Sequence, residues 1–213
     1  MGRRALRKIE PSLDLSAHWK DAASLPESWQ LDKLFDRSAP LEVEVGSGKG
    51  LFLERATGKR PENNFVGIEV SRKYSRFTAA RLARTERSDA LVIHGDAFVI
   101  FARHVADAAL HAVHVYFPDP WWKKRHRKRR IMQPSFLQDV VRVLAPGGRL
   151  HFWTDVKEYF DVALEAIAGF PELKGPFEVP EIAAQHDLDF QSHFERRTRL
   201  EELPVYRSEF ERA

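Results

Sequence analysis

Short apolar runs of strand length alternate with longer amphipathic segments from residue 41 onward. The runs are rich in branched and aromatic residues and predict strands over residues 41–45, 64–70, 90–96, 111–117 and 149–155. The segments between and after them carry apolar residues at helical spacing and predict helices over residues 49–57, 72–87, 97–108, 134–145 and 156–170. This alternation predicts an α/β fold with a mostly parallel, twisted sheet and helices on both faces.

The first 39 residues lack this alternation and are mixed and polar, with Pro11 and Pro26 as punctuation. We expect them to form a partly flexible N-terminal extension with room for one short helix. Residues 40–213 then form one Rossmann-like domain, in keeping with a chain of 213 residues. The tail beyond Pro171 is less regular, and residues 187–212 are the candidate source of the closing strands.

A glycine-rich turn, "EVGSGKG", follows the first predicted strand and opens a helix. Its glycines are Gly46, Gly48 and Gly50, and such a turn lets the backbone approach a ligand at the switch point of a doubly wound sheet. The spacing G-x-G-x-G differs from the dinucleotide fingerprint, and Lys49 lacks the context of a phosphate-binding loop. Taken alone, the turn is also compatible with a plain structural role.

Three acidic residues near the glycine turn indicate which kind of ligand binds there. Glu44 precedes the glycine turn, where it would face the cationic end of a cofactor. Glu69 ends the second strand, where an acid can accept hydrogen bonds from ribose hydroxyls, and Asp96 ends the third, where it can meet an adenine amino group. An acidic pocket of this kind fits S-adenosylmethionine, and the helix, Pro-Gly-Gly turn and strand of "LAPGGRLHFWTD" recur at this place in methyltransferases of this fold.

Positive charge is concentrated in one segment. The net charge is +3, and seven Lys and Arg residues between positions 123 and 130 contribute +7, so the rest of the chain sums to −4. A local patch of this kind indicates a polyanionic partner. A solvated helix face or loop is the alternative interpretation. The candidate RNA contacts are Arg125, Arg127, Lys128, Arg129 and Arg130.

The segment "PDPWW" lies directly before this basic run. Pro118 and Pro120 fix the backbone on both sides of Asp119, while Trp121 and Trp122 can stack on a base or wall a pocket. Base-amine methyltransferases carry D/N-P-P-aromatic at the same place, whereas the order here is Pro-Asp-Pro-Trp. A proline-stiffened loop with aromatic caps is the structural alternative, but the adjacent basic run favours a role in chemistry.

Together, "EVGSGKG", "GIEVSRKY", "HGDA", "FPDPWWKKRHRKRR" and "TDVKEYFD" resemble the bacterial tRNA (guanine-N7-)-methyltransferase family over residues 40–213. The resemblance implies that Lys123 and Asp155 contact the substrate guanosine. "SHFERR" is similar to the family's T-x-x-E segment, with Ser192 in place of Thr, Glu195 kept, and Thr198 where the family has glycine. The resemblance implies that the family's cofactor and catalytic acids correspond to Glu44, Glu69, Asp96 and Asp119, and Gly46 and Gly48 of the turn are the further cofactor-binding candidates.

The expected activity is that of a class I S-adenosylmethionine-dependent methyltransferase acting on tRNA. The resemblance implies methylation of guanine N7, at the variable-loop guanosine of tRNA position 46. N7 has an in-plane lone pair and no proton, so Asp119 is expected to orient the base and stabilise developing positive charge. An RNA base-amine methyltransferase and a non-catalytic RNA-binding protein of the same fold are the alternatives. A nicotinamide enzyme is disfavoured by the glycine spacing.

Several classes of site are excluded or disfavoured. The chain has no cysteine, which excludes disulfides and thiolate chemistry. His111 and His114 are three residues apart on a predicted strand, which predicts opposite faces, so we expect no metal site. The N-terminus lacks the apolar segment of a signal peptide and no run reaches membrane-spanning length, so a cytoplasmic protein is expected. The sequence leaves a monomer and a homodimer equally open.

Overall fold

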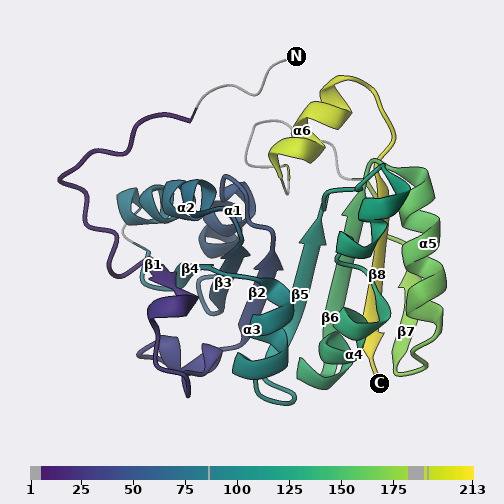
Figure 1. Cartoon of the computed structure of the whole chain (residues 1–213), viewed down its shortest axis with the longest axis horizontal. Helices are drawn as coiled ribbons and strands as arrows, with labels where there is room; N and C mark the ends of the chain where they lie inside the picture. The colour runs from purple at the N-terminus through teal and green to yellow at the C-terminus, as the bar shows by residue number, and fades with distance from the viewer. Residues whose placement is uncertain (1–5, 86, 182–189, 191) are drawn as a thin grey trace.

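The computed structural model describes residues 6–85, 87–181, 190 and 192–213. Within them, one sheet has the strand order β1-β4-β3-β2-β5-β6-β8-β7 (Figure 1). The strands are β1 (Trp19–Asp21), β2 (Leu41–Val45), β3 (Asn64–Glu69), β4 (Ala90–His94), β5 (Leu110–Tyr116), β6 (Leu144–Thr154), β7 (Leu173–Phe177) and β8 (Tyr206–Arg212). The α-helices are α1 (Leu51–Lys59), α2 (Arg72–Arg84), α3 (Ala97–His104), α4 (Pro134–Val143), α5 (Lys157–Ala168) and α6 (His193–Leu200).

The sheet is parallel from β1 to β6 and antiparallel at its β8 and β7 edge. β2 pairs with β3 on one side and with β5 on the other, so the strand order reverses between β2 and β5. This is the topological switch point, and the carboxyl ends of both strands lead into it. The predicted Rossmann-like fold is confirmed, and the five predicted strands correspond to β2, β3, β4, β5 and β6.

Helices cover the two faces of the sheet in separate groups. On one face, α3, α4 and α5 pack Phe101, Phe136 and Tyr159 against Val43 and its neighbours on β2. On the other face, α1 and α2 contribute a second cluster that includes Phe52 and Leu82. Because every residue of β2 and β3 is buried, the central strands fix the carboxyl ends that carry the candidate acids.

Part of the expected N-terminal extension is built onto the sheet. β1 pairs with β4 in parallel, and Trp29 and Leu31 belong to the main core cluster. Two short 3₁₀ helices, η1 (Ala22–Ser24) and η2 (Leu31–Leu34), stand where one short helix was expected. The division of the chain at residue 39 stays a prediction, but at least residues 19–34 contribute to the folded body.

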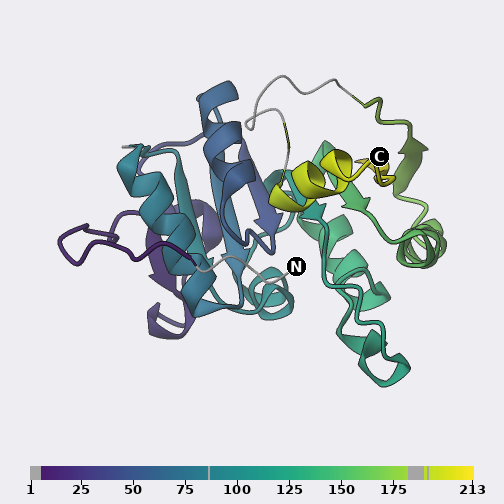
Figure 2. The same cartoon turned by 90° about the horizontal axis from the view of Figure 1, so that it is seen from above.

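The tail differs from its prediction. β8 arises from the expected segment, whereas β7 lies before it and α6 is a helix inside it. The helix begins at Ser192, whose hydroxyl accepts a hydrogen bond of 3.0 Å from the Glu195 amide, as helix-capping residues do. Seen from above, α6 lies over the carboxyl ends of the parallel strands (Figure 2). The tail therefore places side chains above the switch point as well as completing the sheet.

Candidate functional site

The glycine turn between β2 and α1 is held by hydrogen bonds from three sides. The Gly46 amide donates to the Ile68 carbonyl at 2.8 Å, the Thr78 hydroxyl donates to the Gly48 carbonyl at 2.9 Å, and the Gly48 amide donates to Glu69 Oε2 at 2.9 Å. Gly50 has a φ of 71° and a side chain there would collide with Thr78. The turn is therefore a fixed backbone surface at the switch point.

Glu69 is locked at the edge of this turn. Besides the Gly48 amide, the Ser71 amide donates to its Oε1 at 2.8 Å. Burial raises the pKa of Glu69, the two amides oppose that shift, and the negative charge of Asp119 raises the pKa further. The effect of Asp119 shows that the loop after β5 lies close enough to Glu69 for the two carboxylates to interact. Each oxygen of Glu69 keeps a lone pair for a donor from a ligand.

Glu44 and Ser47 carry buried polar atoms without partners. Glu44 is 4% exposed, and neither its Oε2 nor the Ser47 hydroxyl has a hydrogen-bond partner among the described residues. Burial, and then the charge of Glu69, raise the pKa of Glu44 well above its usual value. An unpaired buried polar group costs roughly 1–3 kcal/mol. A ligand with an ammonium group at this point would remove that cost, which is the polarity of the amino-acid end of S-adenosylmethionine.

Asp96 and Val70 lie at the outer part of the same edge. Asp96 is exposed and caps α3, accepting a 2.9 Å hydrogen bond from the Phe98 amide on Oδ1. Val70 follows Glu69 directly and is 74% exposed, so an apolar surface stands beside the ribose-binding candidate. Sequence reasoning missed Val70, although an apolar residue directly after a strand-ending acid was visible. Glu44, Glu69 and Asp96 thus offer groups whose chemistry fits the ammonium group, the ribose and the adenine of S-adenosylmethionine.

Asp119 is exposed on a loop with an unusual backbone. Phe117 and Trp121 both have left-handed backbones, with φ of 49° and 46°, a costly conformation for aromatic residues. The Phe117 amide donates to the Trp153 carbonyl at 2.8 Å, and Arg130 Nε donates to the Pro120 carbonyl at 2.8 Å. The loop is therefore pinned on both sides of Asp119, beyond the stiffness that the two prolines supply.

The basic run forms the 3₁₀ helix η3 (Lys124–Arg129), and Lys123 stands exposed just before it. Arg125, Lys128 and Arg129 are exposed, and the Arg129 guanidinium lies over the Trp121 ring, 5.1 Å from its centroid. Arg127 is about half exposed and pairs with Glu158 at 3.2 Å. These four side chains remain available as candidate RNA contacts.

Arg130 is different, and its predicted RNA contact is corrected. Its side chain is 6% exposed and forms a 2.7 Å ion pair with Glu158. Its guanidinium also packs over the Tyr159 ring, 4.6 Å from the centroid. Arg130 therefore anchors the basic run to α5 inside the protein, and it is not presented to a macromolecule.

The first turn of α6 lies over the Asp119 loop. Phe194 is 43% exposed and its ring stacks on Phe117 with centroids 6.3 Å apart. Ser192 is the cap of this helix, and Glu195 is 2% exposed with its Oε1 3.3 Å from Arg199. Sequence reasoning singled out Ser192 and Glu195 but missed Phe194 between them. Asp155 is exposed just after β6, also at the carboxyl end of the sheet.

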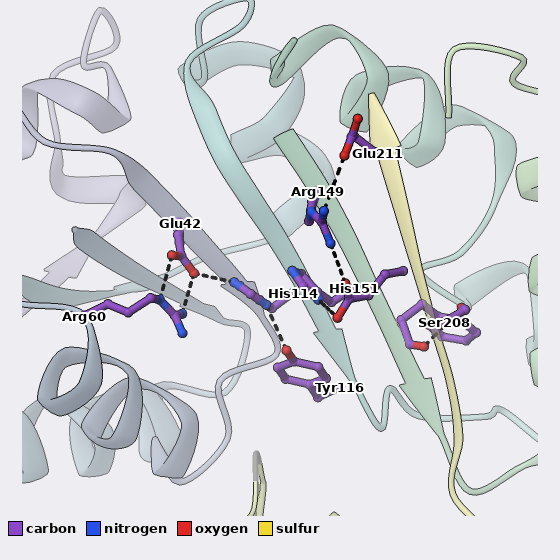
Figure 3. Close-up of polar contacts among 10 residues, drawn as sticks. Glu42, Arg60, His114, Tyr116, Arg149, His151, Ser208 and Glu211 are labelled. Atoms are coloured by element: carbon purple, nitrogen blue, oxygen red, sulfur yellow. Dashed lines mark hydrogen bonds and ion pairs between the residues drawn. The ribbon is translucent and has the colours of Figure 1, made fainter. Parts of the chain in front are cut away.

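A second polar cluster lies on the sheet face below the cofactor end (Figure 3). Glu42 accepts hydrogen bonds of 2.7 Å from both Arg60 and His114, and His114 Nδ1 lies 2.9 Å from the Tyr116 hydroxyl. Burial, followed by the charge of His151, lowers the pKa of His114 to about 4. Burial on its own would raise the pKa of Glu42, but His114 and Arg60 together lower it to about 2. His114 is therefore neutral near pH 7.

This cluster lines a cavity of about 360 Å³. His111, Ala112 and His114 all line it, so this lining leaves the prediction that His111 and His114 lie on opposite faces of β5 untested. Within the described residues, no group of three or more His, Asp or Glu side chains is placed to hold a metal ion. Nor does the described chain contain a helix that is both long and apolar enough to cross a membrane.

Comparisons with known proteins identify a matching family and several sequence relatives. A family model described as "Putative methyltransferase" matches residues 38–208. A tRNA (guanine-N(7)-)-methyltransferase of Rhodopirellula baltica is 50% identical, with 97% of this chain and 79% of that protein covered. One from Alkalilimnicola ehrlichii is 36% identical over 81% of this chain and 70% of that protein.

Among solved structures, the aminoglycoside resistance methyltransferase NpmB1 superposes with a TM-score of 0.55 at 15% identity, over 82% of this chain and 87% of that one, which supports the fold alone. The family model and the sequence relatives show the family. The chain belongs to the tRNA (guanine-N7-)-methyltransferases, a family of S-adenosylmethionine-dependent enzymes.

Proposed function

We propose that this protein transfers a methyl group from S-adenosylmethionine to N7 of a guanosine in tRNA, the variable-loop guanosine at position 46. The single observation that carries this proposal is the position of Asp119. Its exposed carboxylate is close enough to Glu69 for the two charges to interact, and it stands four residues before an exposed basic run. The residues proposed for the cofactor, for the methyl transfer and for the tRNA phosphates thus follow one another along the carboxyl edge of the sheet.

The proposed cofactor contacts come from the glycine turn and from acids at or just after the ends of β2, β3 and β4. Glu44 would pair with its ammonium group, Glu69 would accept from the ribose hydroxyls, and Asp96 would accept from the adenine amino group. The small size of Gly46 and Gly48 would let a cofactor approach the backbone closely. When bound, S-adenosylmethionine supplies a methyl group on a positively charged sulfur.

In this proposal Asp119 interacts with the base through its charge and does not accept a proton from it. Guanine N7 has a free lone pair, so no proton must leave for it to accept a methyl group, and the methylated base becomes cationic. A fixed carboxylate close to the base stabilises that developing charge. Because the loop backbone is pinned at Phe117 and Pro120, Asp119 needs little reorganisation when the charge appears.

The guanosine and its phosphates are assigned to the neighbouring side chains. Lys123 and Asp155 are exposed at the carboxyl end of the sheet and are proposed to contact the guanosine. Ser192 and Glu195 are proposed to do so through the first turn of α6, although Ser192 is engaged as a cap and Glu195 is paired with Arg199. The proposed phosphate contacts of the basic run are Arg125, Arg127, Lys128 and Arg129.

Two further proposals concern the location of the protein and the organisation of its chain. A tRNA-modifying enzyme of this kind works in the cytoplasm, and we propose that location here. The extension over residues 1–39 and the domain over residues 40–213 are proposed as the two parts of the chain, with monomer and homodimer both open.

Nucleoside chromatography tests the function. The protein is incubated with tRNA and labelled S-adenosylmethionine, and the tRNA is then digested to nucleosides. Label in 7-methylguanosine is the expected result. Label in a base methylated on an exocyclic amine would replace the proposal with the base-amine alternative. Cofactor binding without any labelled nucleoside would favour a non-catalytic RNA-binding protein.

A further inference from the structure

Several exposed arginines around the site are held on aromatic rings. Arg129 lies over Trp121 at 5.1 Å, and Arg197 lies over Phe194 at 5.2 Å. The third case is a pair, because Arg72 and Arg76 both lie over Trp19, at 5.1 and 5.5 Å from the ring centroid. The first two belong to the loop and the helix already placed at the site, whereas the Trp19 group has no role in the site described above.

This arrangement differs from the carboxylate pairs made elsewhere in the chain. Arg142 pairs with Asp107 at 2.7 Å and Arg149 with Glu209 at 3.0 Å. A carboxylate neutralises the charge of its arginine and occupies its N–H groups. An aromatic face orients a guanidinium for about 0.5–1 kcal/mol at an exposed site and leaves both its charge and its donors available.

The Trp19 ring is itself fixed by the fold. Trp19 begins β1, which pairs with β4, and its indole N–H donates to the Ser75 hydroxyl at 2.9 Å. Arg72 makes one exposed ion pair with Asp21 at 3.3 Å, a kind of contact that contributes little. Arg76 and Lys73 are exposed and have no carboxylate partner within the described residues.

The group lies on the opposite side of the site from the basic run. α2 begins three residues after Glu69, so its first turns border the proposed cofactor site on the β3–β4 side. η3 follows Asp119 on the β5 side of the switch point. α2 starts at the carboxyl end of β3 and packs against β3 and β4, whereas α6 lies over the carboxyl ends of the strands (Figure 1). Two separate positive surfaces therefore flank the site.

We infer that Arg72, Lys73 and Arg76, arranged on Trp19, form a second contact surface for the tRNA backbone. A folded RNA presents phosphates on both sides of a base that enters the site, and preoriented guanidinium groups suit phosphate oxygens. This inference rests on the proposed function. It adds that the N-terminal strand β1 acts in substrate binding through the surface that it organises.

The test compares two variants that lose the same charge. One is Arg72→Ala, Lys73→Ala and Arg76→Ala. The matched control is Lys59→Ala, Arg103→Ala and Lys174→Ala, which removes three exposed cations away from the site. The binding of tRNA is measured by fluorescence anisotropy over a salt series, without cofactor. Thermal unfolding and S-adenosylmethionine binding are measured in both, and Arg76→Gln alone serves as the least disruptive variant.

The variant that lacks Arg72, Lys73 and Arg76 should bind tRNA at least tenfold more weakly than the control variant. Its slope of log affinity against log salt should be smaller in magnitude by about 2–3. Arg76→Gln should lower that slope by about 1. The kcat at saturating tRNA should stay near that of the wild type, with the loss in the KM for tRNA. If this triple variant and the control variant have the same tRNA affinity and the same salt slope, the inference is overturned. If the wild-type protein binds tRNA but forms no 7-methylguanosine, the proposed function fails, and the slope still decides on the surface.

Discussion

The Gly48 amide donates a 2.9 Å hydrogen bond to Glu69, so the glycine turn and the acid that ends β3 hold each other in place. The same carboxylate interacts with Asp119 across the switch point. The glycine turn, Glu69 and Asp119 are thus linked by a hydrogen bond and by their charges. The negative charge of the two carboxylates is suited to a cationic cofactor and to a base that becomes cationic during the reaction.

Cofactor binding should release a proton from Glu44. Burial and the charge of Glu69 favour the neutral form of Glu44, whereas a bound ammonium group favours the ionised form and lowers its pKa. Affinity for S-adenosylmethionine should therefore rise with pH until Glu44 ionises in the free protein. Calorimetry in buffers of different ionisation enthalpy measures the proton directly. Glu44→Gln should bind more weakly and release none, and equal proton release by this variant would assign the proton elsewhere.

Asp119→Ala should lower kcat strongly and leave tRNA binding nearly unchanged. Removing a preorganised electrostatic group costs roughly 10²–10³ in kcat, and the exposed Asp119 side chain supports no core packing. Single-turnover methylation with anisotropy binding on the same samples separates the two effects. Asp119→Asn should retain the base contact and still lose most of the rate. Normal turnover with a tenfold weaker tRNA complex would contradict the assigned role.

Arg130→Ala should destabilise the protein, whereas Arg125→Ala should not. Arg130 is buried against Tyr159 and paired with Glu158, but because Glu158 is itself 43% exposed, the expected loss is about 1–3 kcal/mol. Arg125 is exposed, so its replacement should change the free energy of unfolding by less than about 0.5 kcal/mol. Urea unfolding measures both. Equal stability of the two variants would return Arg130 to the set of RNA contacts.

Acid should unfold the protein through the Glu42–His114 pair. The pKa of His114 is lowered from 6.5 to about 4, so the unfolded state takes up this proton first and stability is lost as pH falls from 6.5 toward 4. The pKa of Glu42 is lowered from 4.5 to about 2, so its contribution is lost between those values. The His114 share between pH 6.5 and pH 5 is about 2 kcal/mol.

Urea unfolding at several pH values, with His114→Gln as the comparison, checks this behaviour. The variant should show a shallower loss of stability between pH 6.5 and pH 5 than the wild-type protein. Parallel curves would mean that the acid sensitivity comes from other groups.

The sequence was informative where a short pattern determines the structure. The apolar runs predicted the parallel strands β2 to β6, because strands buried on both faces need apolar residues at nearly every position. The acids at the ends of β2 and β3 followed from the same pattern. Glu44 and Glu69 therefore came together in the structure as the strand order required.

Other features depend on distant partners that no local pattern contains. Nothing in "KRHRKRR" shows that Arg130 turns inward, because its partners Glu158 and Tyr159 come from α5. β1 is three residues long and is a strand only because β4 offers it a free edge. α6 did have a local signal, since a Ser followed three residues later by Glu is a capping pattern. The expectation of a closing strand in that segment overrode it.

The most direct measurement of the central claim is chemical cleavage of tRNA after the reaction. Borohydride and aniline cut an RNA chain at 7-methylguanosine, so they report the modified atom and its position together. With S-adenosylmethionine and the wild-type protein, cleavage is expected at the variable-loop guanosine of position 46, and it should be strongly reduced with Asp119→Ala over the same reaction time. Methyl incorporation into tRNA without cleavage at any guanosine would contradict the account.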